Sequence, residues 1–199
     1  LFTAQSQGTQ LLRQPTLSSS EIVFVYANDL WKVDMNGGNA LRLTTNEGYE
    51  SAPHFSPDEQ WIAFSAEYDG NTDVYVIPAT GGSPKRLSYH PRPDIVQGWT
   101  PDGEVIFRSD RERYPTRLNR WYTIGMKGGL PTQMDIPRIA SGELSPDGKY
   151  VAYEPITYWD AGWRNYRGGQ AMPIRILDLD SKELMRTPQL DAERHLDPV

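Results

Sequence analysis

Short runs of apolar residues alternate along the chain with polar connections that are rich in Gly, Pro, Asp and Ser. Trp61–Phe64, Val74–Ile77 and Val105–Phe107 are typical of these runs. They contain many β-branched and aromatic residues, which favour strands. No segment keeps the 3.6-residue hydrophobic period of an amphipathic helix. The pattern therefore predicts an all-β protein that is built of many short strands.

One turn motif occurs three times between these runs. Its copies are Ser56-Pro57-Asp58-Glu59, Thr100-Pro101-Asp102-Gly103 and Ser145-Pro146-Asp147-Gly148, and their prolines are 44 and 45 residues apart. Proline presets φ for the first corner, aspartate bonds to the following backbone, and glycine adopts the left-handed conformation without steric cost. Each copy predicts a hairpin, and the constant spacing predicts a repeat protein. Glu59 stands in the glycine position, where a left-handed conformation would cost roughly 1 kcal/mol.

Further features recur at matching offsets in each repeat. A third strand is expected at Asp29–Val33, Asp73–Ile77 and Arg120–Ile124. A Gly-Gly hairpin signal follows at 37–38, 81–82 and 128–129, and then a fourth strand that contains Leu43, Leu87 or Met134. The fourth repeat replaces Gly-Gly with the polar turn Asp178–Lys182. In a degenerate first repeat, Pro15–Ser18 matches Pro53–Ser56 but the Pro-Asp turn is lost.

Four short antiparallel strands in about 44 residues describe one blade of a β-propeller. We therefore expect four-stranded blades at about 14–46, 49–90, 94–136 and 139–190, with a fifth beginning at His195. An immunoglobulin-like sandwich has no reason to repeat its turns at this spacing. Residues 1–13 carry no periodicity and are expected to form a tether or the remnant of a secretory signal, so the partial propeller occupies 14–199.

Composition and charge exclude several classes of function. The net charge of −6 and the pI of about 5.1 make a nucleic-acid partner unexpected. No apolar run approaches the roughly 18 residues that span a bilayer, and the absence of cysteine excludes disulfides and thiol chemistry. Residues 1–7 read either as the tail of a secretory signal or as an arbitrary boundary. The first reading predicts a periplasmic or secreted protein, and the second allows a cytoplasmic one.

The Pro-Asp repeats resemble the WD40-like repeats of TolB-type propellers. Ile22–Val25, Asp29-Leu30-Trp31 and Gly162–Gly169 more narrowly resemble the N-terminal six-bladed propeller of tricorn-type serine peptidases. Six blades of about 44 residues would need about 260 residues, so four blades of such a ring are visible here. The resemblance implies a non-catalytic region that guides or gates oligopeptides toward a distant serine active site. The alternatives are a TolB-like periplasmic scaffold that binds proteins without enzymatic activity, and the propeller cap of an α/β-hydrolase peptidase.

The sequence offers no catalytic or metal-binding motif. It contains no G-x-S-x-G, H-E-x-x-H or P-loop pattern, so no catalytic residue, metal or cofactor is predicted. His54, His90 and His195 lack metal-ligand spacing, and a structural role is expected for His54. Asp69–Asp73 hints at a cation loop, but it lacks the further acidic ligands of a calcium site, which favours a hairpin turn capped by aspartate.

The connections between second and third strands do not repeat. They lengthen along the chain at 66–72, 109–119 and 156–172, and repeat proteins place such insertions on the binding face. The longer two are rich in Arg and aromatic residues, including Arg108, Arg111 and Arg120, as interface hot spots are. The candidate residues for binding peptides or other domains are Arg113, Tyr114, Arg117, Trp159, Trp163, Tyr166 and Arg167. Alternatively, the arginines pair with Asp110 and Glu112, and the tryptophans pack their loop onto its own blade.

The first strands of the repeats are expected to line a central channel. They are 51–56, 95–99 and 139–144, and their small residues suit crowding near an axis. Those small residues are Ser51, Ala52, Gly98, Ser141 and Gly142. An open array of four blades leaves sheet faces uncovered. The isolated chain is therefore expected either to associate with further copies of itself, as a homo-oligomer, or to be poorly stable.

Overall fold

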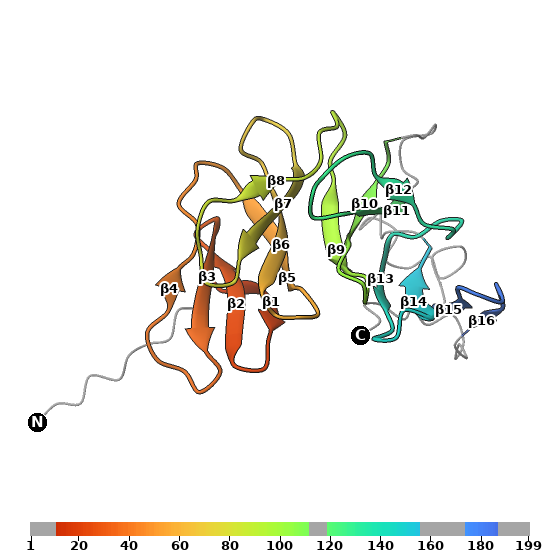
Figure 1. Cartoon of the computed structure of the whole chain (residues 1–199), viewed down its shortest axis with the longest axis horizontal. Helices are drawn as coiled ribbons and strands as arrows, with labels where there is room; N and C mark the ends of the chain where they lie inside the picture. The colour runs from red at the N-terminus through yellow and green to blue at the C-terminus, as the bar shows by residue number, and fades with distance from the viewer. Residues whose placement is uncertain (1–10, 112–118, 156–173, 187–199) are drawn as a thin grey trace, which may run out of the picture.

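The computed structural model describes residues 11–111, 119–155 and 174–186 and contains sixteen strands in four antiparallel sheets (Figure 1). Blade 1 consists of β1 (Arg13–Leu17), β2 (Glu21–Tyr26), β3 (Asp29–Asp34) and β4 (Leu41–Arg42). Blade 2 consists of β5 (Glu50–Phe55), β6 (Trp61–Ala66), β7 (Asp73–Pro78) and β8 (Lys85–Arg86). Blade 3 consists of β9 (Ile95–Trp99), β10 (Val105–Ser109), β11 (Arg120–Ile124) and β12 (Thr132–Gln133). Blade 4 consists of β13 (Ser141–Leu144), β14 (Tyr150–Glu154), β15 (Arg175–Asp178) and β16 (Leu184–Arg186).

Each sheet is a simple meander in which neighbours in the sequence are neighbours in space. This arrangement confirms the expected fold class of four-stranded blades. The described part of the chain contains no helix with the length and hydropathy that a membrane crossing requires. β1 begins at Arg13, one residue before the start expected for the first blade, and the expected fifth blade at His195 lies outside the described residues.

The three Pro-Asp turns have the same hydrogen bond. The N–H groups of Glu59, Gly103 and Gly148 donate to the carbonyls of Ser56, Thr100 and Ser145, at 2.8, 3.0 and 2.8 Å. All three donors have positive φ, and Glu59 has a φ of 58°. Glu59 thus adopts the left-handed conformation of the two glycines.

The third and fourth strands also meet as expected. The Gly-Gly pairs have positive φ and lie between β3 and β4, β7 and β8, and β11 and β12. The fourth strands are only two residues long in blades 1 to 3. Leu43, Leu87 and Met134 lie one residue beyond them, and their N–H groups each add one more bond to the ladder, at 2.8, 2.8 and 2.9 Å.

The core lies between the blades because successive residues of a strand point to opposite faces. Ile62 and Phe64 of β6 pack against Val23, Val25 and Leu30 of blade 1. Ala63, between them, faces the core that blade 2 shares with blade 3. The residues 61–64 form an unbroken apolar run because both faces of β6 are buried.

One backbone hydrogen bond recurs at each junction between blades. The N–H groups of Glu50, Asp94 and Ile139, at or just before the start of an inner strand, donate to the preceding blade. Their acceptors are the carbonyls of Asn28, Thr72 and Asn119, at 3.1, 2.9 and 3.4 Å. Each acceptor directly precedes a third strand, so every blade is attached to the next at the same point.

Candidate functional site

The inner strands β1, β5, β9 and β13 lie side by side, and a cavity of about 420 Å³ opens between them. Among its lining residues are Gln14, Ala52, His54, Gln97, Arg108, Ser141 and Glu143. They come from all four blades, so the cavity lies where the sequence predicts an axial channel, and it is named the channel. It is the candidate functional site.

Two strained residues line this channel. The β1–β2 and β5–β6 ladders both shift register within the inner strand, and Gln14 and Ala52 have φ of 49° and 50° at these bulges. The N–H of Ala52 donates to Oε1 of Gln14 at 2.9 Å, which joins the bulges of adjacent blades. Bulges re-aim side chains, and strained non-glycine residues concentrate at functional sites. The channel wall therefore has a shape that simple pleating would not give.

The channel wall also carries three ionisable groups. Burial lowers the pKa of His54 to about 4, so its imidazole is neutral at neutral pH. Burial also lowers the pKa of Arg108, whose Nη1 donates to the carbonyl of Ala140 at 3.0 Å. Partial burial raises the pKa of the Glu143 carboxyl. Together with the Gln97 amide, these groups offer donors and acceptors suited to a polar, extended ligand.

A second cavity of about 360 Å³ shares Ile95 and Arg108 with the channel. Its other lining residues are Arg92, Pro93, Asp110 and Asn119. Asp110 and Asn119 flank the connection between β10 and β11, one of the connections that do not repeat. The second cavity therefore lies beside the channel and borders the two ends of this connection.

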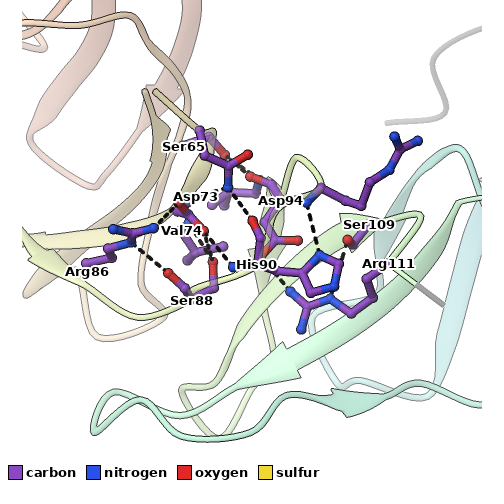
Figure 2. A network of polar contacts seen from close by, with 12 residues as sticks. Ser65, Asp73, Val74, Arg86, Ser88, His90, Asp94, Ser109 and Arg111 are labelled. Atoms are coloured by element: carbon purple, nitrogen blue, oxygen red, sulfur yellow. Dashed lines mark hydrogen bonds and ion pairs between the residues drawn. The ribbon is translucent and has the colours of Figure 1, made fainter. Parts of the chain in front are cut away.

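A polar network holds this face together (Figure 2). Asp73 is fully buried, and its carboxylate pairs with Arg86 at 2.5 Å and accepts from Ser88 Oγ and His90 N, both at 3.3 Å. Arg86 also pairs with Asp69 at 2.9 Å. The two aspartates of the suggested cation loop thus surround a guanidinium, as the hairpin reading allows.

A second ion pair lies in the same view (Figure 2). Nη2 of Arg111 is 2.5 Å from Oδ2 of Asp94, and both side chains are buried, at 9% and 0% exposure. The guanidinium carbon lies 5.0 Å from the ring centres of both Phe107 and Tyr122. Arg111 is therefore fixed inside blade 3 and does not extend from the surface.

None of the seven candidate binding residues can be placed. Arg113, Tyr114, Arg117, Trp159, Trp163, Tyr166 and Arg167 all lie outside the described residues. Their role stays a prediction.

The described arginines of this region have partners inside the protein. Arg108 and Arg120 lie in strands β10 and β11, and Nη1 of Arg120 donates to the Ile136 carbonyl at 3.3 Å. Asp110 pairs with Arg92, so its partner comes from the connection before β9. The sequence placed Arg108 with the loop, whereas the structure places it in the channel wall. Its position directly after the three apolar residues that begin β10 was the available signal.

Two glycines of the inner strands have other causes than the expected crowding at the axis. A Cβ on Gly142 would lie 2.5 Å from the Ala152 carbonyl oxygen of its own blade, so it is the neighbouring strand that requires glycine. Gly98 has a φ of 146° with nothing within 4 Å of a Cβ position, and it lies at the bulge between β9 and β10. Backbone conformation, and not space, selects Gly98.

A family model described as the tricorn protease N-terminal beta propeller domain matches residues 9–199. The chain belongs to this family. It is 28% identical over 183 residues to tricorn protease homolog 1 of Streptomyces coelicolor, covering 92% of this chain and 17% of that protein. It is 26% identical over 176 residues to the tricorn protease of Thermoplasma acidophilum, covering 83% of this chain and 16% of that protein. The chain thus spans about one sixth of these relatives.

Solved structures agree on the fold. The crystal structure of the tricorn protease superimposes with a TM-score of 0.74 at 23% identity, over 90% of this chain and 18% of that chain. A putative TolB from Agrobacterium tumefaciens superimposes with a TM-score of 0.70 at 21% identity, over 90% of this chain and 62% of that chain. At such identities the likeness concerns the propeller fold alone. The family match distinguishes the tricorn reading from the TolB-like alternative.

Proposed function

We propose that this propeller region guides or gates oligopeptides toward a serine active site elsewhere in a tricorn-like peptidase. The observation that carries the proposal is the channel between the inner strands, together with the adjoining cavity that Arg108 and the ends of the β10–β11 connection line. Membership of the tricorn propeller family supports a peptide as the ligand. The chain itself supplies binding and passage, and the peptide bond is cleaved by residues outside it.

The chemistry of the wall suits an extended peptide. Such a chain presents alternating N–H and C=O groups, which require acceptors and donors at short intervals. Glu143 offers acceptors, while Arg108 and Gln97 offer donors. The amide of Gln97 is bonded only to carbonyls of its own strand, at 2.8 and 3.4 Å, so it can exchange these bonds for a ligand. The channel wall therefore binds the backbone of a peptide by polar contacts, which do not depend on the peptide's sequence.

The test narrows the channel in the full-length peptidase. Gln97→Trp places a large side chain in the lining, and Gln133→Trp makes the same exchange on the exposed outer strand β12. We expect Gln97→Trp to lower kcat/KM for long peptides by about tenfold and to leave a short chromogenic substrate unchanged, since the barrier concerns passage. Gln133→Trp should leave kcat/KM unchanged for both the long peptides and the short substrate. Equal loss for both substrates, or no loss for long peptides, would overturn the guiding role.

The candidate binding residues can be tested in the same assay. Alanine at Trp163 and Arg167 should lower peptide hydrolysis while the melting temperature stays unchanged, because interface residues contribute to binding more than to folding. A drop in melting temperature with unchanged hydrolysis would show instead that these side chains pack their own loop.

A further inference from the structure

A cavity of about 330 Å³ lies between the Pro-Asp turns of blades 2 and 3. Its wall includes Pro57, Asp58 and Trp61 from blade 2, and Trp99, Asp102 and Met126 from blade 3. These residues belong to the turns between strands 1 and 2 and between strands 3 and 4, or to strand ends beside them. In a meander, these turns lie at the end of the sheet opposite the connections between strands 2 and 3. The cavity is therefore separate from the proposed peptide face.

At the corresponding junctions on this face, the turns of neighbouring blades touch directly. Between blades 1 and 2, the Glu59 carboxylate binds Ser19. Between blades 3 and 4, a Cβ on Gly148 would lie 2.9 Å from Cγ of Pro101. Between blades 2 and 3, the cavity lies between the two turns.

Two indole side chains form fixed walls of this cavity. Nε1 of Trp99 donates to the carbonyl of His54 at 2.9 Å, which sets the orientation of the ring. Trp61, Trp99 and Met126 all pack against the core between blades 2 and 3 while part of each side chain remains accessible. The cavity is thus preformed, and a ligand would not have to order its walls.

Two carboxylates give the cavity a negative rim. Oδ1 of Asp58 accepts from Ser56 Oγ at 2.5 Å and from Gln60 N at 3.1 Å, and these bonds lower the pKa of Asp58 and keep it ionised. Neither Asp58 nor Asp102 forms an ion pair with a described residue. Lys85 reaches the same junction, but its Nζ donates to the Met126 carbonyl at 2.7 Å.

We propose that this cavity binds the guanidinium group of an arginine side chain from a partner polypeptide. A guanidinium can stack on an indole face and donate hydrogen bonds to carboxylates at its edge. Arginine is favoured over lysine because its planar, weakly hydrated head suits an aromatic wall. The volume lies at the lower end of ligand pockets, which suits one side chain and not a long segment. The proposal stands independently of the peptide channel.

The test titrates the full-length protein that contains this chain, labelled with ¹⁵N at its tryptophan indoles, with the peptide acetyl-Gly-Arg-Gly-amide. The readouts are the indole N–H signals of Trp61 and Trp99. We expect the peptide to shift these two signals in a saturable way. The affinity should fall as salt is added, because salt screens the charge contacts. A matched peptide with citrulline, which keeps the shape and removes the charge, should not produce the shifts.

Variants locate the binding at the carboxylates. Asp102→Asn should weaken the arginine peptide by about fivefold, the effect of one lost charge contact near the surface. Asp180→Asn, an exposed aspartate in the turn of blade 4, should leave the affinity unchanged. Equal binding of the citrulline peptide, tighter binding of a lysine peptide, or no saturable shift at the two indoles would each overturn the proposal.

Discussion

The carboxylate of Glu59 accepts two hydrogen bonds from Ser19, which lies 40 residues earlier in the chain. The backbone N–H of Ser19 is 2.7 Å from Oε1, and its Oγ is 2.5 Å from Oε2. Glu59 holds the left-handed position that glycine occupies in the other turns, and Ser19 lies where blade 1 has lost its Pro-Asp turn. At the junction of blades 1 and 2, the Glu59 side chain from the turn of blade 2 thus takes the place of the Pro-Asp turn that blade 1 lacks.

Two substitutions of Glu59 should separate the energetic effect of its backbone strain from that of its hydrogen bonds to Ser19. Glu59→Ala keeps the unfavourable φ and loses both bonds, so we expect a loss of about 1 kcal/mol in unfolding free energy. Glu59→Gly also loses the bonds but relieves roughly 1 kcal/mol of strain, and it should lie close to the parent protein. Urea unfolding measures both, with Glu47→Ala as the exposed control. If Glu59→Gly is the less stable of the two, the left-handed conformation at this position does not carry the expected strain.

The buried pair of Asp94 and Arg111 should respond differently to single and double substitution. Arg111→Met leaves the Asp94 carboxylate buried without its partner, which should cost about 3 kcal/mol. Adding Asp94→Leu removes the unpaired charge, so the double variant should recover most of the loss. Thermal unfolding of the four proteins gives the coupling energy. Additive losses would mean that Arg111 contributes through its contacts with Phe107 and Tyr122 instead.

Glu50 should make stability depend on pH. Its carboxylate accepts from Leu30 N at 2.8 Å, from Thr44 Oγ1 at 2.5 Å and from the Tyr68 hydroxyl, yet burial dominates and raises its pKa. Because the folded protein then holds a proton that the unfolded chain releases, this contribution is present at low pH. It is lost as pH rises from the ordinary glutamate value through the raised one.

The matching variant is Glu50→Gln, which keeps an acceptor oxygen for Leu30. The difference in unfolding free energy between parent and variant, measured from pH 4 to pH 8, should shift in favour of the variant as pH rises. The slope has an upper limit of about 1.4 kcal/mol per pH unit for one proton. A difference that stays constant, or that moves in favour of the parent, would show that the three hydrogen bonds outweigh burial.

The repeating part of the fold could be predicted from the sequence because it is local. The Pro-Asp turns, the Gly-Gly pairs and the third strands each depend on a few neighbouring residues, and three or four copies confirm one another. The bulges could not be predicted in this way. Nothing local requires Ala52 to have a φ of 50°, which is held by pairing with β6 and by the Gln14 side chain of another blade.

The candidate site was harder to predict for the same reason. Arg108 resembles the other arginines near the β10–β11 connection, and only the assembled blades show that it borders two cavities. Glu143 and Gln97 are ordinary polar residues of strands, and they come to line one cavity only when the inner strands meet. Sequence features that repeat in each blade identify the residues that build the scaffold. Residues of a binding surface differ from blade to blade, so repetition does not identify them.

Gly103 and Gly148 provide a matched pair that isolates the packing between blades 3 and 4. Both occupy the same turn position with φ of 87° and 74°, so an alanine at either carries the same backbone strain of about 1 kcal/mol. A Cβ on Gly103 meets nothing within 4 Å, whereas one on Gly148 would lie 2.9 Å from Pro101 Cγ and 3.2 Å from its Cδ.

We therefore expect Gly103→Ala to cost about 1 kcal/mol and Gly148→Ala about 2 to 3 kcal/mol, since overpacking adds to strain. Urea unfolding of the two variants measures the difference. Equal losses would mean that the turns of blades 3 and 4 separate without cost, and that the core below them alone joins these blades.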